Sequence, residues 1–238
     1  MQDLSNILND ILNGALIIPE EYEALLDNIK ESEGGYLHYN SKETNITNGY
    51  GVYRTVHPNA LVFKYIDAVA SGITNTPSQD WRDKTLLSKI DSTIDKKVDR
   101  YLSYLFYNEY LKDAHLELFD KSNVTLMANL YTNSQRGAWK SIQEGLLDIQ
   151  RDGILNIPIT SLSTVDGAYG TKTRDALLLL KNIETETVLE KVLIMKVFKK
   201  SVLLAMKSFY IDITIANPDK FMKNLNGWDN RVEELEHN

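Results

Sequence analysis

A long apolar repeat near the C-terminal end is the feature that most constrains the fold of this chain. Between residues 186 and 213, apolar side chains recur every three or four residues, at Val188, Val192, Met195, Phe198, Val202, Ala205 and Phe209. This spacing puts them on one face of a single long helix, and other helices must cover such a face. Similar periodicity predicts helices at about 19–33, 59–70, 84–119, 125–133, 138–150 and 173–183. The sequence therefore predicts a mainly α-helical fold.

Three breaks interrupt this helical pattern. Residues 36–57 are rich in tyrosine, asparagine and threonine and contain two glycines, which favours an irregular loop or a small β-hairpin. Residues 153–170 contain three glycines and a proline, and this break is the best candidate for a domain boundary. We expect Pro218 to end the last long helix.

Charge and composition argue against several classes of protein. The 238 residues include 26 basic and 33 acidic side chains, so the net charge is −7 and a general nucleic-acid binder is disfavoured. Cysteine is absent, which excludes disulfides and thiolate chemistry. No two of the four histidines have a metal-ligand spacing, and we expect neither a metal nor an organic cofactor. No apolar run approaches the ~18 residues of a membrane span, and the first residues lack the basic segment of a signal peptide.

Glu33 is the main candidate for a catalytic side chain. It lies at the predicted end of a helix, directly before Gly34 and Gly35. A carboxylate is disfavoured at a helix C-terminus, so a desolvated Glu33 would have a raised pKa. A raised pKa suits a general acid, as in glycosidases, and the glycines would let a bulky substrate approach. A solvated glutamate with no catalytic role is the alternative interpretation.

The residues around Glu33 resemble a known enzyme family. The strings ESEGGY and NITNGYGVY, at 31–36 and 45–53, resemble the start of glycoside hydrolase family 108, the lysozyme-like muramidases of phages and bacterial secretion systems. Further resemblances follow in the family's order, at 104–120, 126–146 and 224–235. The string VDGAYGTKTRDAL, at 165–177, resembles the turn of peptidoglycan-binding modules. Together these matches cover all but about the first twenty residues.

The resemblance implies a fold, an activity and a division of the chain. It implies a lysozyme-like catalytic region at 20–137 and a helical peptidoglycan-binding module at 138–238. Outside the match, apolar residues that fall on one helical face near the N-terminus predict a helical extension at 1–19. The implied activity is cleavage of peptidoglycan between N-acetylmuramic acid and N-acetylglucosamine, with Glu33 as general acid. Thr47 matches the family threonine. The family aspartate falls on Lys42, and a shift of one residue would put Glu43 in that role.

Four further residues are candidates for substrate binding. Tyr36 and Tyr50 belong to the matched loop, and Asn133 ends the helix that faces this loop in lysozyme-like folds. The indole of Trp228 could stack on a sugar ring, although an aromatic residue near a C-terminus more often packs the tail on the core. Capping of a helix is the alternative role of Asn133.

The motif at 165–177 also has a direct physical interpretation. Asp166 can close an Asx-turn, the glycines can adopt positive φ, and either Thr171 or Thr173 can cap the helix that follows. On this interpretation the motif positions two core helices, and we weigh that role equally with peptidoglycan binding.

Two other activities remain open. The replacement of the family aspartate by Lys42 favours a peptidoglycan-binding protein without catalysis, and a lytic transglycosylase would need Glu33 alone. Peptidoglycan is the expected partner in each case, with no nucleic acid and no integral membrane segment. Without a signal peptide we expect synthesis in the cytoplasm, with a holin or a secretion machine giving access to the cell wall or periplasm.

Overall fold

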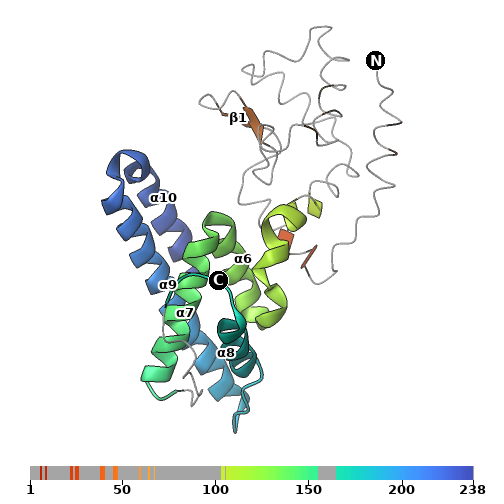
Figure 1. Ribbon diagram of the computed structural model, residues 1–238. Helices are drawn as coiled ribbons and strands as arrows, with labels where there is room; N and C mark the ends of the chain where they lie inside the picture. The colour runs from red at the N-terminus through yellow and green to blue at the C-terminus, as the bar shows by residue number, and fades with distance from the viewer. Residues whose placement is uncertain are drawn as a thin grey trace. The chain divides into compact units, whose positions relative to one another are not determined.

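The computed structural model describes most of the C-terminal half of the chain. The described residues are 6, 9, 22, 23, 25, 26, 38–40, 45–47, 59, 64, 67, 103, 104, 106–154 and 165–237. The chain separates into two compact units, unit 1 (residues 1–109) and unit 2 (residues 110–238). The described residues are mainly helical, as the sequence predicts (Figure 1).

In unit 1 two short strands form an antiparallel pair. Strand β1 (His38–Asn40) pairs with strand β2 (Asn45–Thr47), and His38 lies opposite Thr47. Both strands fall within the segment 36–57, for which the sequence predicts a loop or small hairpin. Elsewhere in this unit Leu25 and Leu26 are buried, and the ring of Tyr22 stacks on that of Tyr107.

Between 107 and 118 the chain forms three short helical segments, one π-helical and two 3₁₀, instead of the end of a long α-helix. A π-helical turn, η2 (Tyr107–Leu111), is followed by two 3₁₀ turns, η3 (Lys112–Ala114) and η4 (Leu116–Leu118). The prediction of one helix over 84–119 is therefore wrong at its C-terminal end. His115 explains the interruption, because its φ of 51° is left-handed and cannot continue a right-handed helix.

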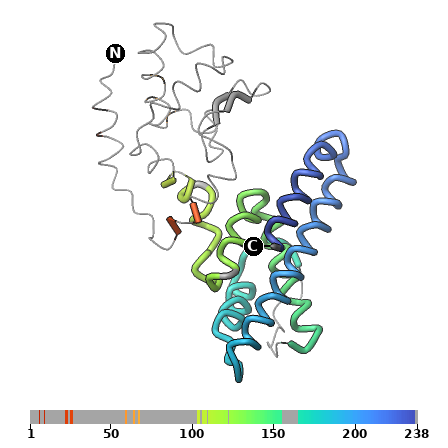
Figure 2. Tube along the Cα trace, turned by 180° about the vertical axis from the view of Figure 1, so that it is seen from behind, coloured from red at the N-terminus to blue at the C-terminus, as the bar shows by residue number. Residues whose placement is uncertain are grey.

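The described residues of unit 2, 110–154 and 165–237, form five α-helices. They are α6 (Lys121–Asn133), α7 (Gln135–Arg151), α8 (Thr171–Lys181), α9 (Val188–Ala216) and α10 (Pro218–His237). Helix α9 packs against α7 and α10, and both views show these helices side by side (Figures 1 and 2). The core of the unit lies along α9, where Phe198, Val202 and Met206 are almost completely buried.

Local side-chain caps explain where three of these helices begin. Asp120 accepts the backbone N–H of Asn123 at the start of α6, and Ser134 accepts that of Gly137 at the start of α7. At α9, Thr187 accepts the N–H of Glu190. Each acceptor satisfies a backbone donor that has no partner within the first helical turn.

The capping prediction for α8 is wrong. Gly170 is the N-cap of α8 and offers no side chain to the backbone. Thr171 is exposed, and Thr173 is buried within the helix, where its Oγ1 accepts a hydrogen bond from Gln143. The threonine therefore serves a contact between helices.

Two other predictions hold only in part. Helix α9 ends at Ala216, just before Pro218 as predicted, but Pro218 also begins α10, a helix that the sequence reasoning missed; proline is tolerated in a first helical turn, where its missing N–H has no partner to lose. In α9 the predicted core stripe is buried at Met195, Phe198 and Val202, but Val188 and Val192 are exposed.

The two compact units meet between residues 109 and 110, whereas the resemblance implies a division between residues 137 and 138. The implied division lies inside α7, and α6 belongs to unit 2 together with α7. Gly137 gives the physical reason, because a Cβ built on it would lie only 2.6 Å from the Phe209 ring of α9. Close packing at this position joins the first turn of α7 to the rest of unit 2.

Candidate functional site

The residues predicted for catalysis lie in unit 1. Glu33, Tyr36, Glu43 and Tyr50 fall outside the described residues. Thr47 is the last residue of β2, and its Cα partner across the strand pair is His38. The described residues thus include an antiparallel strand pair that begins five residues after the predicted general acid and has the matched threonine at its end.

In unit 2 the loop before α8 is held by one buried amide. The Oε1 of Gln143 accepts the backbone N–H of Gly167 at 2.9 Å. Its Nε2 lies within hydrogen-bonding distance of Asp166 Oδ1 (3.0 Å), Ala168 O (3.0 Å) and Thr173 Oγ1 (3.2 Å). Gln143 is itself only 2% exposed, so these partners replace the water that the amide loses on folding.

Asp166 closes the turn that the sequence predicts. Its Oδ1 accepts the backbone N–H of Ala168 at 2.8 Å in addition to the bond from Gln143. The hydrogen bond from the Ala168 N–H holds the pKa of Asp166 below its ordinary value, and the bond from Gln143 lowers this pKa further. The ionised carboxylate therefore forms part of the folded loop.

Gly167 completes this loop because no other residue fits its position. Its φ is 72°, and a Cβ added to it would lie 2.8 Å from the backbone oxygen of Arg136. The Asp-Gly pair therefore brings the loop against the first turns of α7. These contacts support the structural interpretation of the motif, in which the loop positions α7 and α8.

An aromatic cluster that the sequence reasoning missed lies beside this loop. The ring of Tyr169 stacks on His115 with centroids 3.9 Å apart and lies 4.7 Å from Trp139. The rings of Tyr131 and Trp139 are nearly perpendicular, with centroids 6.3 Å apart. His115 Nδ1 also lies 3.2 Å from a carboxylate oxygen of Glu117. Helical periodicity does not signal such a cluster, because its four members come from four separate segments.

Burial controls the ionisation of the tyrosines in this cluster. Burial raises the pKa of Tyr169, and the negative charge of Glu117 adds a smaller increase. Burial also raises the pKa of Tyr131, and the negative charge of Asp113 adds to this effect. Both phenols therefore remain protonated at neutral pH and can act only as neutral hydrogen-bonding groups.

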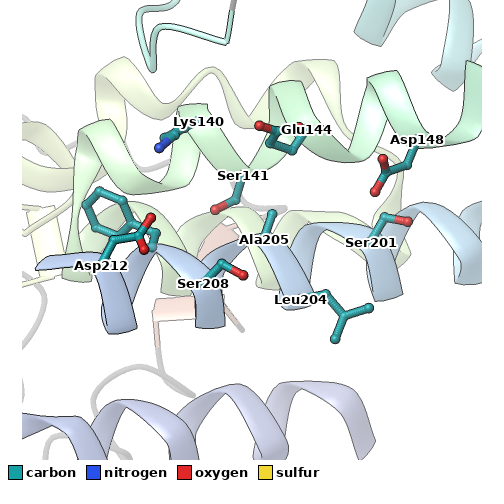
Figure 3. Close-up of a pocket in the computed structure, with 10 residues that line it drawn as sticks. Lys140, Ser141, Glu144, Asp148, Ser201, Leu204, Ala205, Ser208 and Asp212 are labelled. Carbon is teal, nitrogen blue, oxygen red and sulfur yellow. The ribbon is translucent and has the colours of Figure 1, made fainter. Parts of the chain in front are cut away.

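A groove of about 310 Å³ runs between α7 and α9 (Figure 3). Its charged lining consists of Lys140, Glu144 and Asp148 from α7 and Asp212 from α9. Figure 3 shows Lys140 and Asp212 at one end and Asp148 at the other, near Ser201. Within the described residues, Lys140, Glu144 and Asp212 have no hydrogen-bond or ion-pair partner. The four-residue spacing along α7 is the sequence signal that could have found this charged row.

The groove is not a metal centre. No three of the described histidine, aspartate and glutamate side chains are grouped so that they could hold a metal ion. Its lining combines carboxylates, an ammonium group and serine hydroxyls with the apolar Leu204, Ala205 and Phe209. Such a surface can form ion pairs and apolar contacts, as the rim of a protein–protein contact does.

The two predicted substrate-binding residues in unit 2 both contact other parts of the fold. Trp228 stacks on Tyr210, with ring centroids 4.6 Å apart, and lies near Phe221. Asn133 Nδ2 donates to the backbone oxygen of Asn129, and its Oδ1 accepts from Arg231 at 2.6 Å. These contacts attach α10 to α9 and α6, while saccharide binding by either residue stays a prediction.

Comparisons with protein-family models, with curated proteins and with solved structures found no match to this chain. The resemblance to family 108 therefore rests on the residues quoted above. None of the helices in the described part of the chain combines the length and the apolar character needed to cross a membrane.

Proposed function

We propose that this chain is a peptidoglycan hydrolase of lysozyme-like fold that cleaves the bond between N-acetylmuramic acid and N-acetylglucosamine. The observation that carries the proposal is the order of Glu33, the hairpin and Thr47. Strand β1 begins five residues after Glu33, and β2 ends at Thr47. An acid at a helix end followed by a short hairpin is the arrangement that the resemblance implies.

In this mechanism the side chain of Glu33 protonates the glycosidic oxygen as the bond to the sugar breaks. The sugar develops oxocarbenium character, a water molecule adds to its anomeric carbon, and the proton that this water loses passes to the carboxylate left on Glu33, which restores the acid. Thr47 and Glu43 orient that water or stabilise the cationic sugar. No metal or organic cofactor takes part in the proposed reaction.

The C-terminal region serves peptidoglycan binding in this proposal. The string VDGAYGTKTRDAL supports this role by resemblance, and the Gln143 contacts explain how its loop is held. Substrate contacts are assigned to Tyr36 and Tyr50 beside the acid and to Asn133 and Trp228 in unit 2. The enzyme reaches the wall or periplasm through a holin or a secretion machine.

Replacement of Glu33 tests the catalytic assignment. We expect Glu33→Gln to slow the clearing of a purified peptidoglycan suspension by at least about 100-fold, because the amide cannot supply the proton. Glu31→Gln, two residues earlier, is the matched control and should retain activity. Full activity in a folded Glu33→Gln variant removes Glu33 from the mechanism.

Lys42 favours one alternative, a wall-binding protein without catalysis. In that case the chain would sediment with insoluble peptidoglycan but release no new reducing ends. The enzymatic alternative, a lytic transglycosylase, would release fragments with anhydro-muramyl ends. Sedimentation and product analysis on the same sample separate the three functions.

A further inference from the structure

The strand pair of unit 1 has one polar face. Residues directly opposite each other in an antiparallel pair lie on the same face, as do residues two apart along a strand. The register sets His38 opposite Thr47 and Asn40 opposite Asn45. These four residues, called here the polar face, therefore lie together on one side of the strand pair. All four are of types that form hydrogen bonds, as the hydroxyl and N-acetyl groups of a saccharide require.

Within the polar face, His38 is the register partner of Thr47. Paired residues of an antiparallel sheet have Cα atoms about 5 Å apart. The proposed function assigns Thr47 to the attacking water or the cationic sugar. The register then brings residue 38 to the same part of the site, although the resemblance gives His38 no role.

The charge of the polar face changes near neutral pH at His38. Histidine is the side chain whose charge ordinarily changes between about pH 5 and 8. Strand β2 contains no ionisable residue, and Tyr39 of β1 lies on the opposite face. The connecting residues 41–44 contribute Lys42 and Glu43, residue types that ordinarily keep their opposite charges across this range.

This charge bears on the reaction because the sugar itself becomes positive. In the proposed hydrolysis the ring develops oxocarbenium character as the bond to the leaving oxygen breaks. A neutral imidazole can accept a hydrogen bond from a sugar hydroxyl. An imidazolium ion can only donate, and it adds a positive charge beside the developing cation. Protonation of a histidine at this position therefore slows bond cleavage.

We propose that His38 is a further residue of the active site, where its neutral ring contacts the reacting sugar and its protonation slows the reaction. The inference rests on the proposed function and deepens it, since it assigns the acid limit of the hydrolysis. Glu33 gives the opposite dependence, because a general acid must hold its proton in order to act. Turnover therefore falls in acid as His38 gains a proton and falls in base as Glu33 loses one.

The pH dependence of turnover on purified peptidoglycan tests this assignment. At saturating substrate we expect the wild-type rate to pass through a maximum between about pH 5 and 8. His38→Gln keeps a hydrogen-bonding side chain that does not titrate. Its rate at pH 5, relative to its own maximum, should therefore exceed the wild-type ratio by about tenfold or more. His38→Lys stays charged and should be slower than the wild type by about tenfold or more near the wild-type maximum.

Two controls separate this effect from a change in the fold. His237→Gln removes a histidine from the end of α10 in unit 2 and should keep the wild-type profile. His38→Asn is a second neutral variant, and circular dichroism checks the fold of each. In the wild-type chain, an NMR titration of the His38 ring should have the same midpoint as the fall in rate toward acid.

A wild-type rate that does not fall toward acid overturns the proposal, and so does a different midpoint for the His38 ring. A folded His38→Gln or His38→Asn chain that keeps the fall also overturns it. These results leave the proposed function in place as long as Glu33→Gln is inactive. An active, folded Glu33→Gln variant instead removes the general acid itself, and a wild-type chain without turnover at any pH overturns both proposals.

Discussion

Gln143 and Asp166 lie 23 residues apart in the sequence, and a hydrogen bond of 3.0 Å joins Gln143 Nε2 to Asp166 Oδ1. The same amide accepts the N–H of Gly167, so one side chain holds both residues of the Asp-Gly turn. The loop before α8 is thereby tied to the middle of α7. This relationship explains why a motif typical of a binding module also has a role in the fold.

Removing the amide tests this relationship. We expect Gln143→Leu to lower the free energy of unfolding by about 2 kcal/mol or more, because the buried N–H of Gly167 loses its acceptor. Gln135→Leu, the same change at an exposed position in α7, should alter stability by less than about 0.5 kcal/mol. Urea unfolding followed by tryptophan fluorescence measures both. Equal stability of the two variants would contradict the account of the loop.

Alanine substitutions at three glycines distinguish the cost of backbone strain from the cost of steric overlap. Gly170→Ala should change stability little, because its φ of −156° is extended and a Cβ there meets open space. Gly153→Ala should lower the free energy of unfolding by about 1 kcal/mol through its φ of 66° alone. Gly167→Ala should lower it further, because the new Cβ also meets the backbone oxygen of Arg136. Denaturant midpoints that do not follow this order would contradict the explanation.

The Asp166 carboxylate predicts a loss of stability in acid. The pKa of Asp166 is lowered in the folded state, so the carboxylate stabilises the fold fully above the ordinary pKa of about 3.9. This stabilisation is lost as the pH falls through the lower pKa of the folded state. Asp166→Asn should remove this part of the pH dependence while retaining an oxygen acceptor for Ala168. An NMR titration of the carboxyl carbon should give a midpoint below the ordinary value. A midpoint at or above that value would show that the two hydrogen bonds do not favour the charged form.

Trp228 allows packing and saccharide binding to be separated. We expect Trp228→Ala to lower the free energy of unfolding by about 1–3 kcal/mol, since the half-buried ring stacks on Tyr210. Trp228→Phe should recover most of that stability. Sedimentation with peptidoglycan then reports the second role: if Trp228→Phe is stable but binds the wall less, the indole contacts the saccharide. Unchanged stability in Trp228→Ala would contradict its role in attaching α10.

Patterns that repeat along the chain predicted the fold best. The apolar spacing located α7, α8 and α9, and the Asp-Gly pair located the turn before α8, because helices and turns depend on neighbouring residues. Pro218 correctly marked the end of α9 but did not reveal α10, since proline occurs both after a helix and in its first turn. Val188 and Val192 fit the repeat of α9 but lie on exposed positions near its start.

The features that sequence did not predict depend on contacts between distant segments. His115 adopts a left-handed conformation without a glycine to signal it, and it stacks on Tyr169 from the loop before α8. The groove likewise combines Glu144 of α7 with Asp212 of α9. Of the region predicted for catalysis, the structure describes the strand pair that follows Glu33 in the sequence and the position of Thr47 at the end of β2.

Mass spectrometry of the fragments released from purified peptidoglycan tests the proposed hydrolysis most directly. The account predicts soluble fragments that end in reducing N-acetylmuramic acid, each one water heavier than its anhydro counterpart, and their loss in Glu33→Gln. Fragments with anhydro-muramyl ends, fragments with reducing N-acetylglucosamine ends or the absence of new fragments from an active, wall-bound preparation would contradict it.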